Sequence, residues 1–307
     1  MRYVILTDIH ANALALEAVM DEVEALLAAG EPLEVWFLGD LLGYGPDPIE
    51  CLQWLWQQPM DLPKRWVPGN HDEWFTYQQA DGLSDDAVDS LRRHAEQMAL
   101  PEHAALSDWF YTELRAALAD PARSLLQQSF AHGRVALGVH AAVSPVVRRT
   151  LYLKPWEPYL LRAEFPRLRA EVGEAAAAVM FCGHNHYPMW AEAQDDGEVG
   201  LRSIRYYEPL PLRTDGLTIV NPGSVGQPRD GDPRAAYALF DARAWTIEFR
   251  RVKYSWETAA ALLKARNYRP SLAERLVDAQ HDHTSHYLSV YQRPQWDLRA
   301  EGDEWTE

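Results

Sequence analysis

Residues 1–10, Met-Arg-Tyr-Val-Ile-Leu-Thr-Asp-Ile-His, join an apolar run typical of a buried β-strand to two polar side chains, Asp8 and His10. The same arrangement recurs four times along the chain. Apolar runs over 35–38, 66–67, 135–139 and 178–182 lead into the blocks Gly39-Asp40, Gly69-Asn70-His71-Asp72, His140 and Gly183-His184-Asn185-His186. Open α/β folds bind ligands beyond the carboxyl ends of their strands, so we expect these side chains to converge at one edge of a parallel sheet.

Helical patterns separate the first strands. The spacing of apolar residues predicts a helix over 12–29, ending at Gly30, and another over about 49–56. Alternation of strand and helix is typical of parallel strands joined by crossover helices. The sequence therefore predicts an α/β fold.

Two segments interrupt this alternation. From about 73 to 128 the composition predicts helices over 85–98 and 104–118, which we interpret as a helical cap insertion over part of the sheet edge. The segment 144–174 contains four prolines and should be a loop followed by a helix.

The later part of the chain carries β-strand patterns over 218–220, 236–240 and 246–252, which predict a second sheet packed on the first. Short helices are expected over 256–265 and 271–279, with Ser271 as N-cap and Glu274 completing a capping box. Beyond residue 280 the sequence is polar and irregular. We therefore expect one domain over 1–280 and a loosely held C-terminal tail over 281–307.

Composition narrows the class of function. The chain has 307 residues, of which 47% are hydrophobic and 24% charged, as in ordinary globular proteins. Its net charge of −16 argues against non-specific nucleic-acid binding, whereas divalent cations would still allow a phosphate substrate. No apolar run reaches about 18 residues, so we expect no membrane span. Cys51 and Cys182 are far apart in the sequence, so we expect no disulfide framework. The N-terminus has no signal-peptide pattern, and we therefore expect a cytoplasmic location.

The polar blocks contain hard and borderline metal ligands. Asp8 and His10 are two positions apart and would point the same way in an extended chain, as would His184 and His186. Asp40 follows a glycine, and its two carboxylate oxygens are suited to bridging two metals about 3.5–4 Å apart. Each block alone is more often structural, for example a turn; five in order at strand ends favour a site. Away from these blocks, we interpret other histidines as solvated or locally packed: His94, His103, His132, and the tail residues His281, His283 and His286.

These five blocks resemble the signature of the calcineurin-like metallophosphoesterase superfamily. The loop Asn221-Pro222-Gly223-Ser224 is similar to a further turn of its bacterial phosphodiesterase-like branch, and Asn185 stands where Thr is common. The resemblance implies a four-layer αββα sandwich of two mixed sheets. It also implies two divalent metal ions, with manganese first and iron or zinc as alternatives.

The resemblance further implies a division of roles. Asp8, His10 and His186 would hold one metal, Asn70, His140 and His184 the second, and Asp40 would bridge them. Two cations lower the pKa of a water molecule between them, so that hydroxide attacks the phosphorus. The catalytic residue would be His71, protonating the departing oxygen or neutralising its charge. Asp72 would orient a histidine or lie on the surface.

The blocks also bear on the substrate. Protein Ser/Thr phosphatases and symmetrical dinucleoside-tetraphosphate hydrolases of this superfamily carry phosphate-binding arginines where this chain has Tyr44 and Pro68. Their absence favours a less charged phosphodiester of nucleotide type. Candidate substrate-binding residues are Tyr44, Arg148 and Arg229, and Arg149 lies next to Arg148. For all three arginines, the alternative interpretation is a solvated charge on a loop. Trp74, Phe75 and Tyr187 would stack on a base or pack in the cap.

Other functions remain open. A phosphomonoesterase, including a protein phosphatase, and a dinucleoside-polyphosphate hydrolase use the same ligands. A non-catalytic scaffold is a further alternative, although such proteins typically lack ligands that this chain retains. We expect a small phosphoester substrate as partner, and the sequence leaves the oligomeric state open.

Overall fold

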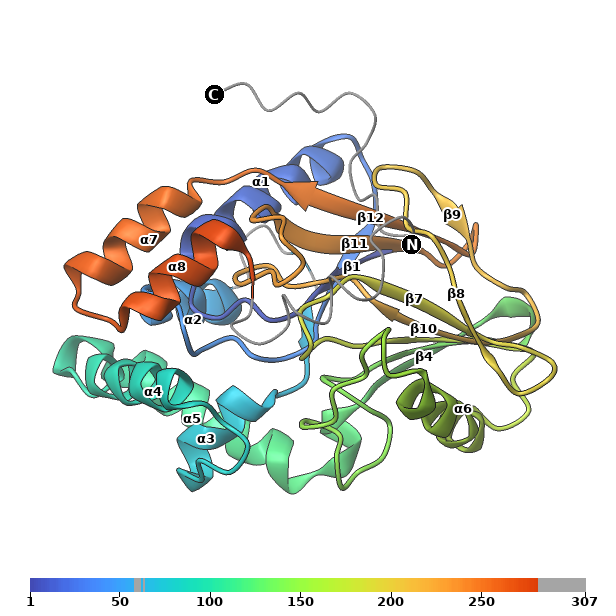
Figure 1. The fold of residues 1–307 in the computed structure, drawn as a ribbon, viewed down its shortest axis with the longest axis horizontal. Coiled ribbons are helices and arrows are strands. Elements are labelled where there is room, and N and C mark those ends of the chain that lie inside the picture. The colour runs from blue at the N-terminus through green and yellow to red at the C-terminus, as the bar shows by residue number, and fades with distance from the viewer. Residues whose placement is uncertain (58–61, 63, 281–307) are drawn as a thin grey trace.

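The computed structural model describes residues 1–57, 62 and 64–280, which form two mixed six-stranded sheets with flanking helices (Figure 1). In spatial order, the first sheet contains β3 (Lys64–Trp66), β2 (Leu33–Phe37), β1 (Arg2–Leu6), β11 (Ala235–Asp241), β12 (Thr246–Val252) and β9 (Leu210–Pro211). The second contains β4 (Leu126–Phe130), β5 (Arg134–Gly138), β6 (Ala177–Phe181), β10 (Gly216–Asn221), β7 (Met189–Ala193) and β8 (Val199–Leu201).

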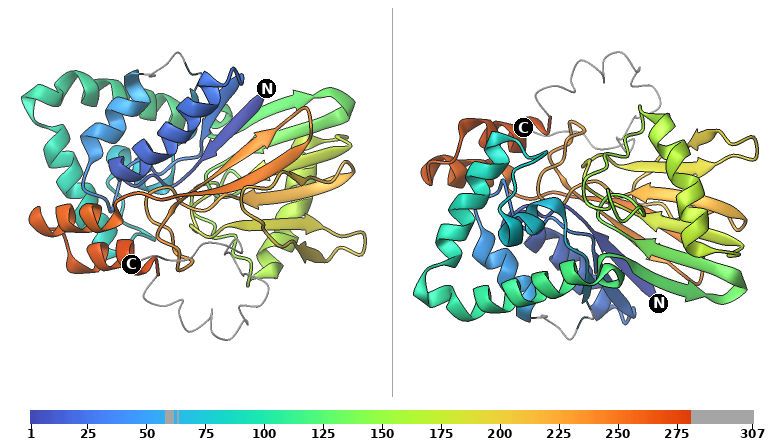
Figure 2. Two further views of the ribbon diagram at one scale, coloured as in Figure 1. Left: turned by 90° about the horizontal axis from the view of Figure 1, so that it is seen from above. Right: turned by 90° about the horizontal axis from the view of Figure 1, so that it is seen from below.

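Helices cover the outer faces of both sheets. The α-helices of the described residues are α1 (Ala13–Ala28), α2 (Pro48–Gln57), α3 (Asn70–Tyr77), α4 (Asp85–Met98), α5 (Ala104–Ala119), α6 (Pro158–Val172), α7 (Trp256–Ala265) and α8 (Pro270–Asp278). Short 3₁₀ turns cover η2 (Pro101–His103), η3 (Pro121–Ser124) and η4 (Ala131–Gly133). Figure 2 shows α6 on one side of the strands and the other helices on the opposite side.

Three apolar clusters lie between these layers and hold them together. In β1, Val4 and Leu6 face a cluster shared with the helices, while Tyr3 and Ile5 face the second sheet, as the two-residue period of a strand requires. The third cluster joins the second sheet to α6 through Leu161 and other residues. The predicted αββα sandwich of two mixed sheets is confirmed.

The membership of the sheets differs from the expectation in one respect. β11 and β12 do not form a second sheet; they extend the first, because β11 pairs antiparallel with β1 on the edge that β2 leaves open. The second sheet is instead built on the parallel strands β5, β6 and β10. Hydrophobic periodicity identifies a strand but does not choose its neighbour.

The predicted helices of the insertion are present as α4 and α5, and α6 follows the proline-rich loop. Leu91 of α4 and Phe110 of α5 belong to the same apolar cluster as α1 and α2. The predicted cap of α8 is wrong: the helix begins at Pro270, because proline suits its first position, and Ser271 donates to Asp86 at 2.7 Å.

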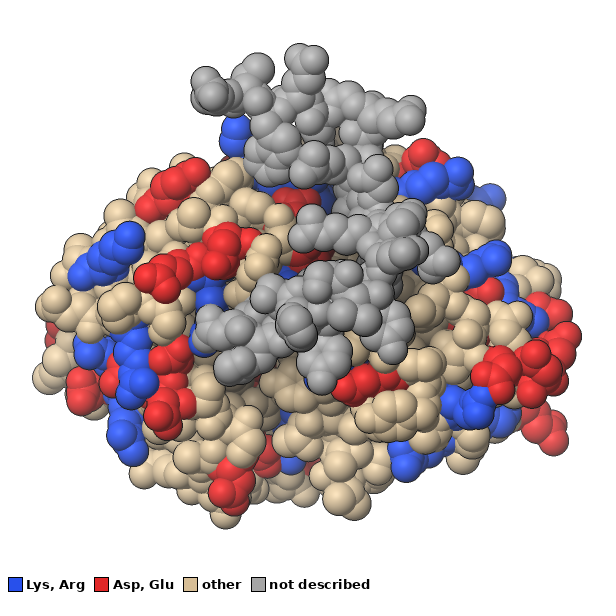
Figure 3. All heavy atoms as spheres, in the orientation of Figure 1, with Lys and Arg blue, Asp and Glu red and all other residues tan. Residues whose placement is uncertain are grey.

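The tail over 281–307, with its three histidines, lies outside the described residues. None of the described helices is long and apolar enough to cross a membrane. On the face seen in Figure 3, acidic and basic side chains are interspersed over the described surface rather than gathered into one basic area.

Candidate metal centre

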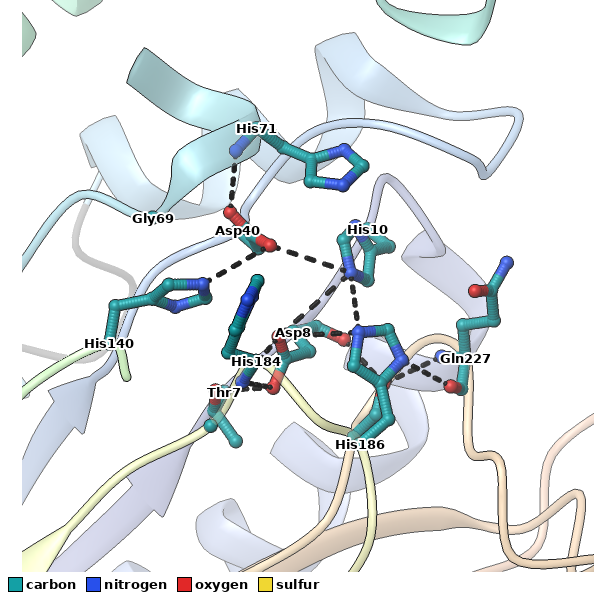
Figure 4. Close-up of polar contacts among 12 residues, drawn as sticks. Thr7, Asp8, His10, Asp40, Gly69, His71, His140, His184, His186 and Gln227 are labelled. Atoms are coloured by element: carbon teal, nitrogen blue, oxygen red, sulfur yellow. Dashed lines mark hydrogen bonds and ion pairs between the residues drawn. The ribbon is translucent and has the colours of Figure 1, made fainter. Parts of the chain in front are cut away.

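The predicted ligands meet where the loops after β1, β2, β5 and β6 approach the N-terminus of α3 (Figure 4). Asp8, His10 and Asp40 follow strands of the first sheet, whereas His140, His184 and His186 follow strands of the second. The expectation of a single sheet edge is therefore wrong. The ends of two sheets supply the side chains, and all these residues are buried.

One group consists of Asp8, His10 and His186, whose ligand atoms lie within 4.8 Å of one another. The Nε2 atoms of the two histidines are 3.1 Å apart, and His186 Nε2 is 3.4 Å from Asp8 Oδ1. His10 Nδ1 lies 3.0 Å from the carbonyl of Leu42, and His186 Nδ1 lies 2.7 Å from the carbonyl of Gln227.

These carbonyls determine the tautomers. An oxygen acceptor requires the proton on Nδ1, so both Nε2 atoms carry lone pairs that face each other and the Asp8 carboxylate. Three facing acceptors repel unless a cation lies between them. This group therefore fits a metal ion.

A second group contains Asp40, His140 and His184, with ligand atoms again within 4.8 Å of one another. His140 Nε2 is 3.3 Å from Asp40 Oδ2, and His140 Nδ1 is 2.7 Å from the carbonyl of Leu38. Asp40 Oδ2 also lies 3.8 Å from His10 Nε2 of the first group. Asp40 therefore lies between the two groups.

The amide of Asn70 joins the second group. Its oxygen is 3.1 Å from His140 Nε2; with nitrogen in that place, the amide would donate to His184 Nδ1 at 3.0 Å and to Asp40 Oδ2 at 3.2 Å. When His140 is neutral with its proton on Nδ1, the oxygen faces acceptors only, which is unfavourable without a cation and favourable with one. The donor set of the second group also fits a metal ion.

The electrostatics of the site keep most of its imidazoles neutral. Burial lowers the pKa of His10, His184 and His186 well below the ordinary value. Burial opposes charge on His140 as well, but Asp40 and Asp8 outweigh it and raise the pKa of His140 to about 9. Burial raises the pKa of Asp8 to about 7. Neutral imidazoles have a lone pair to offer a metal.

The ligand loops adopt an unusual backbone. Five candidate ligands have positive φ angles: Asp8 (54°), His10 (50°), Asp40 (56°), His184 (67°) and His186 (63°). The extended geometry expected for the Asp-x-His and His-x-His spacings is therefore wrong. Left-handed backbone is disfavoured for residues other than glycine and gathers at functional sites, where the surrounding contacts hold it in place.

Glycines allow the two sheets to approach. A Cβ on Gly39 would lie 2.5 Å from the backbone nitrogen of Gly69 and 2.9 Å from His140 Nδ1. A Cβ on Gly69 would collide with the Asp40 carboxylate. Gly39 therefore allows neighbouring loops to pack closely around Asp40.

The Asn221–Ser224 turn braces loops from both sheets. Asn221 Nδ2 donates to the carbonyl of Gly183 at 2.8 Å and to Asn185 Oδ1 at 2.9 Å. Ser224 Oγ donates to the carbonyl of Asp8 at 2.8 Å. The turn thus fixes the first and last ligand blocks relative to each other.

Asp72 has a role that neither of its expected alternatives describes. Its buried carboxylate accepts backbone N–H bonds from Asp40 at 2.8 Å, Leu41 at 3.0 Å and Gly69 at 3.0 Å, with Leu42 at 3.4 Å. It orients no histidine and is not on the surface. Instead it holds the loop that carries Asp40 against the start of α3.

We predict that Asp72→Ala strongly destabilises the protein. The substitution leaves buried N–H donors unpaired, each costing about 1–3 kcal/mol. Urea denaturation followed by circular dichroism measures the loss. Glu73→Gln is the neighbouring control, because Glu73 forms a partly exposed ion pair with Arg149 whose loss costs about 0–1 kcal/mol. Equal stability of the two variants would contradict the role of Asp72.

The candidate arginines separate into two kinds. Arg148 is buried and its guanidinium donates to the carbonyls of Val143, at 3.1 and 2.7 Å, and Pro121, at 3.0 Å. It is neither a solvated charge nor free to bind phosphate, and we withdraw it as a substrate ligand. Arg149 pairs with Glu73 at 2.7 Å.

Arg229 is buried without a carboxylate partner among the described residues. Its Nε has no hydrogen-bond partner, its Nη2 lies 3.4 Å from Gln227 Oε1, and its guanidinium carbon lies 5.9 Å from the centre of the Tyr44 ring. The interpretation as a solvated loop charge is therefore wrong. Tyr44 itself packs at 4.6 Å from the rings of both His10 and His71.

The remaining aromatic and histidine candidates are largely structural. Trp74 and Phe75 belong to the helix-side core, and Tyr187 packs against Trp156 with ring centres 4.7 Å apart. His94 is fully buried and locally packed, which agrees with one of the two alternatives expected for it. It bonds the backbone on both sides of Tyr44, and sequence reasoning did not predict this partner. Ser90, four residues earlier on the same helix face, accepts from the Tyr44 backbone N–H, and this spacing of two polar residues was the available signal.

Comparison with known proteins agrees with this site. The sequence matches the domain described as Calcineurin-like phosphoesterase superfamily domain over residues 1–244. A metallophosphoesterase structure from Sphaerobacter thermophilus is 30% identical, with a TM-score of 0.65 over 91% of this chain and 99% of that one. A hypothetical protein from Pyrococcus horikoshii is 19% identical, with a TM-score of 0.68 over 91% and 98% of the two chains.

A sequence relative was also found, an uncharacterized protein of Methanocaldococcus jannaschii. It is 26% identical over 272 residues, which cover 89% of this chain and 96% of the relative. The similarity thus extends over nearly the whole of both proteins. With its five blocks gathered at the meeting edge of two sheets, this chain belongs to the calcineurin-like phosphoesterase superfamily.

Proposed function

We propose that this protein is a phosphodiesterase that works with two divalent metal ions, manganese first among them, on a small nucleotide-type diester. Asp8, His10 and His186 would hold one ion, Asn70, His140 and His184 the other, and Asp40 would bridge them. The observation that carries the proposal is that two groups of buried ligand atoms, whose lone pairs face one another, meet at Asp40. When bound, two such ions activate water and neutralise phosphoryl charge.

His71 is suited to assist the departing oxygen. Its backbone N–H donates to Asp40 Oδ1 at 2.9 Å, which fixes the residue beside the bridging carboxylate. Its Nδ1 is buried without a partner, so the favourable tautomer places the proton on Nε2. Nε2–H then donates to the departing alkoxide and stabilises its charge.

The small number of arginines at the site favours a diester. A phosphodiester carries one negative charge, and the site offers one buried guanidinium without a carboxylate partner, Arg229. Tyr44 and Pro68 occupy positions where the protein Ser/Thr phosphatases and symmetrical dinucleoside-tetraphosphate hydrolases that this chain resembles have phosphate-binding arginines. A monoester would therefore lose bidentate recognition here.

The substrate class is tested by comparing two chromogenic esters. With Mn²⁺ present, we expect kcat/KM for bis(4-nitrophenyl) phosphate to exceed that for 4-nitrophenyl phosphate by at least about tenfold, one charged hydrogen bond being about 1.5–3 kcal/mol. A clear preference for the monoester would contradict the proposal and identify the protein as a phosphomonoesterase. Cleavage confined to a dinucleoside polyphosphate would identify a pyrophosphohydrolase.

We predict that Arg229→Met raises KM for the diester and lowers kcat/KM by about tenfold to a hundredfold, because one charge-assisted contact to phosphate is lost. Arg149→Met is the matched control, since Arg149 already pairs with Glu73 and should change kcat/KM little. Steady-state kinetics with the diester decide. Equal effects of the two substitutions would show that Arg229 does not bind the substrate.

A cytoplasmic location of the protein stays a prediction.

A further inference from the structure

The loop over 43–47, which carries Tyr44, is tied to the first ligand loop. Gly45 N–H donates to the carbonyl of His10 at 2.9 Å, and Asp47 N–H donates to the carbonyl of Ala11 at 2.8 Å. Neither bond involves α4, so the first ligand loop keeps its contacts with this loop when side chains of α4 are replaced.

Two side chains of α4 hold the other side of the same loop. Ser90 Oγ accepts from the backbone N–H of Tyr44 at 2.8 Å while its own hydroxyl donates to the carbonyl of Ala87 at 2.7 Å. His94 Nδ1 accepts from Gly43 N–H at 3.2 Å, and its Nε2 donates to the carbonyl of Gly45 at 2.9 Å. Ser90 and His94 are fully buried and lie on one face of the helix.

These bonds support a backbone that would not hold by itself. Tyr44 has a φ of 62°, in the left-handed region that residues other than glycine rarely adopt. Gly43 is pressed so closely against His71 that a Cβ would collide with Nδ1 of its ring. The loop therefore has one arrangement in which Tyr44 lies between His10 and His71.

The hydroxyl of Tyr44 makes no hydrogen bond within the described part of the chain. The ring lies 5.9 Å from the guanidinium carbon of Arg229, which we assign to the phosphoryl group under the proposed function. A phenol beside that cation is placed to donate to a phosphoryl oxygen.

We propose that Ser90 and His94 are positioning residues that fix the Tyr44 hydroxyl for the phosphoryl group of the substrate. The segment 85–98 then shapes the site by holding a substrate-contacting loop rather than by contacting substrate itself. This inference rests on the proposed phosphodiesterase function.

A double-mutant cycle tests the inference. In the manganese-loaded full-length protein, we expect Ser90→Ala and His94→Leu each to lower kcat/KM for bis(4-nitrophenyl) phosphate by about tenfold to a hundredfold, the scale of a small misplacement. The inhibition constant of inorganic phosphate should rise, while manganese content stays unchanged. In a Tyr44→Phe background the same substitutions should cost less than about twofold, because the hydroxyl that they position is gone.

Two further variants separate positioning from folding. His94→Gln keeps a donor and an acceptor on one side chain and should restore most of the activity. Ser107→Ala is the matched control on α5, since Ser107 also donates to a backbone carbonyl, that of Met98 at 2.6 Å, but does not touch the loop. It should leave kcat/KM unchanged.

The outcomes distinguish this inference from the proposed function. Equal losses in the wild-type and Tyr44→Phe backgrounds, or loss of manganese in Ser90→Ala, would overturn the positioning role while diester turnover persists. If the wild-type protein cleaves no diester, the proposed function fails. Phosphate affinity, measured by calorimetry, then still decides whether Ser90 and His94 act through Tyr44.

Discussion

Asp40→Ala is expected to lose bound manganese and to reduce diester turnover by at least about a thousandfold. Asp40 Oδ2 lies 3.3 Å from His140 Nε2 and 3.8 Å from His10 Nε2, so one carboxylate serves both candidate metal positions. Removing the shared anion leaves neutral imidazoles facing each other, and groups that stabilise transition-state charge typically contribute about 10²–10³ each. Under the proposed function, both metal positions would depend on this carboxylate.

Metal content after gel filtration, measured by inductively coupled plasma mass spectrometry, reports the first effect, and steady-state kinetics report the second. Asp21→Ala is a suitable control, because Asp21 is an exposed carboxylate on α1. Circular dichroism verifies that both variants fold. An Asp40→Ala protein that retained two manganese ions per chain would contradict the bridging role.

His71→Ala is expected to lower kcat for the diester by about 10²–10⁴-fold, the usual contribution of one general acid or base, with manganese content unchanged. Activity and metal content are expected to respond differently because, under the proposed function, His71 assists the departing oxygen and other residues hold the metals. His71→Gln keeps an N–H donor and should retain more activity than His71→Ala.

The leaving group sharpens this test. A substrate with a poorer leaving group needs more help at the departing oxygen, so ethyl 4-nitrophenyl phosphate should be affected less than a dialkyl ester. Loss of manganese in His71→Ala would instead make His71 a metal ligand, since its ring also lies in a group with His10 and Asp40. Unchanged turnover would remove it from catalysis.

The local elements of the fold follow closely from the sequence. The apolar run before Asp8 is β1, and the predicted helix over 85–98 has the bounds of α4. These elements carry their own signals, namely apolar periodicity and, for α4, the N-cap Ser84, which accepts from Ala87 N–H at 3.2 Å.

Pairing between distant strands does not follow in the same way. β11 joins β1 across more than two hundred residues, and β11 is buried along all but its last residue, so its sequence has no polar face that would assign it to one sheet. The choice depends on which strand edge is left open by the rest of the fold. For this reason the two-sheet origin of the ligands emerges only in three dimensions.

The candidate site shows a similar division. Residue type and order single out Asp8, Asp40 and His140, because five polar blocks in order after buried strands favour a site even though each block alone is more often structural. The backbone angles of the ligands and the hydrogen bonds that hold the ligand loops could not be predicted from the sequence. The positive φ of His10 and the four N–H bonds to Asp72 depend on loops that meet only after folding.

The most direct test is anomalous diffraction from crystals grown with Mn²⁺. We predict two manganese peaks about 3.5–4 Å apart, as in two-metal hydrolases, with Asp40 between them. One peak should contact Asp8, His10 and His186, and the other Asn70, His140 and His184. A single peak, or two peaks that do not share Asp40, would contradict the account.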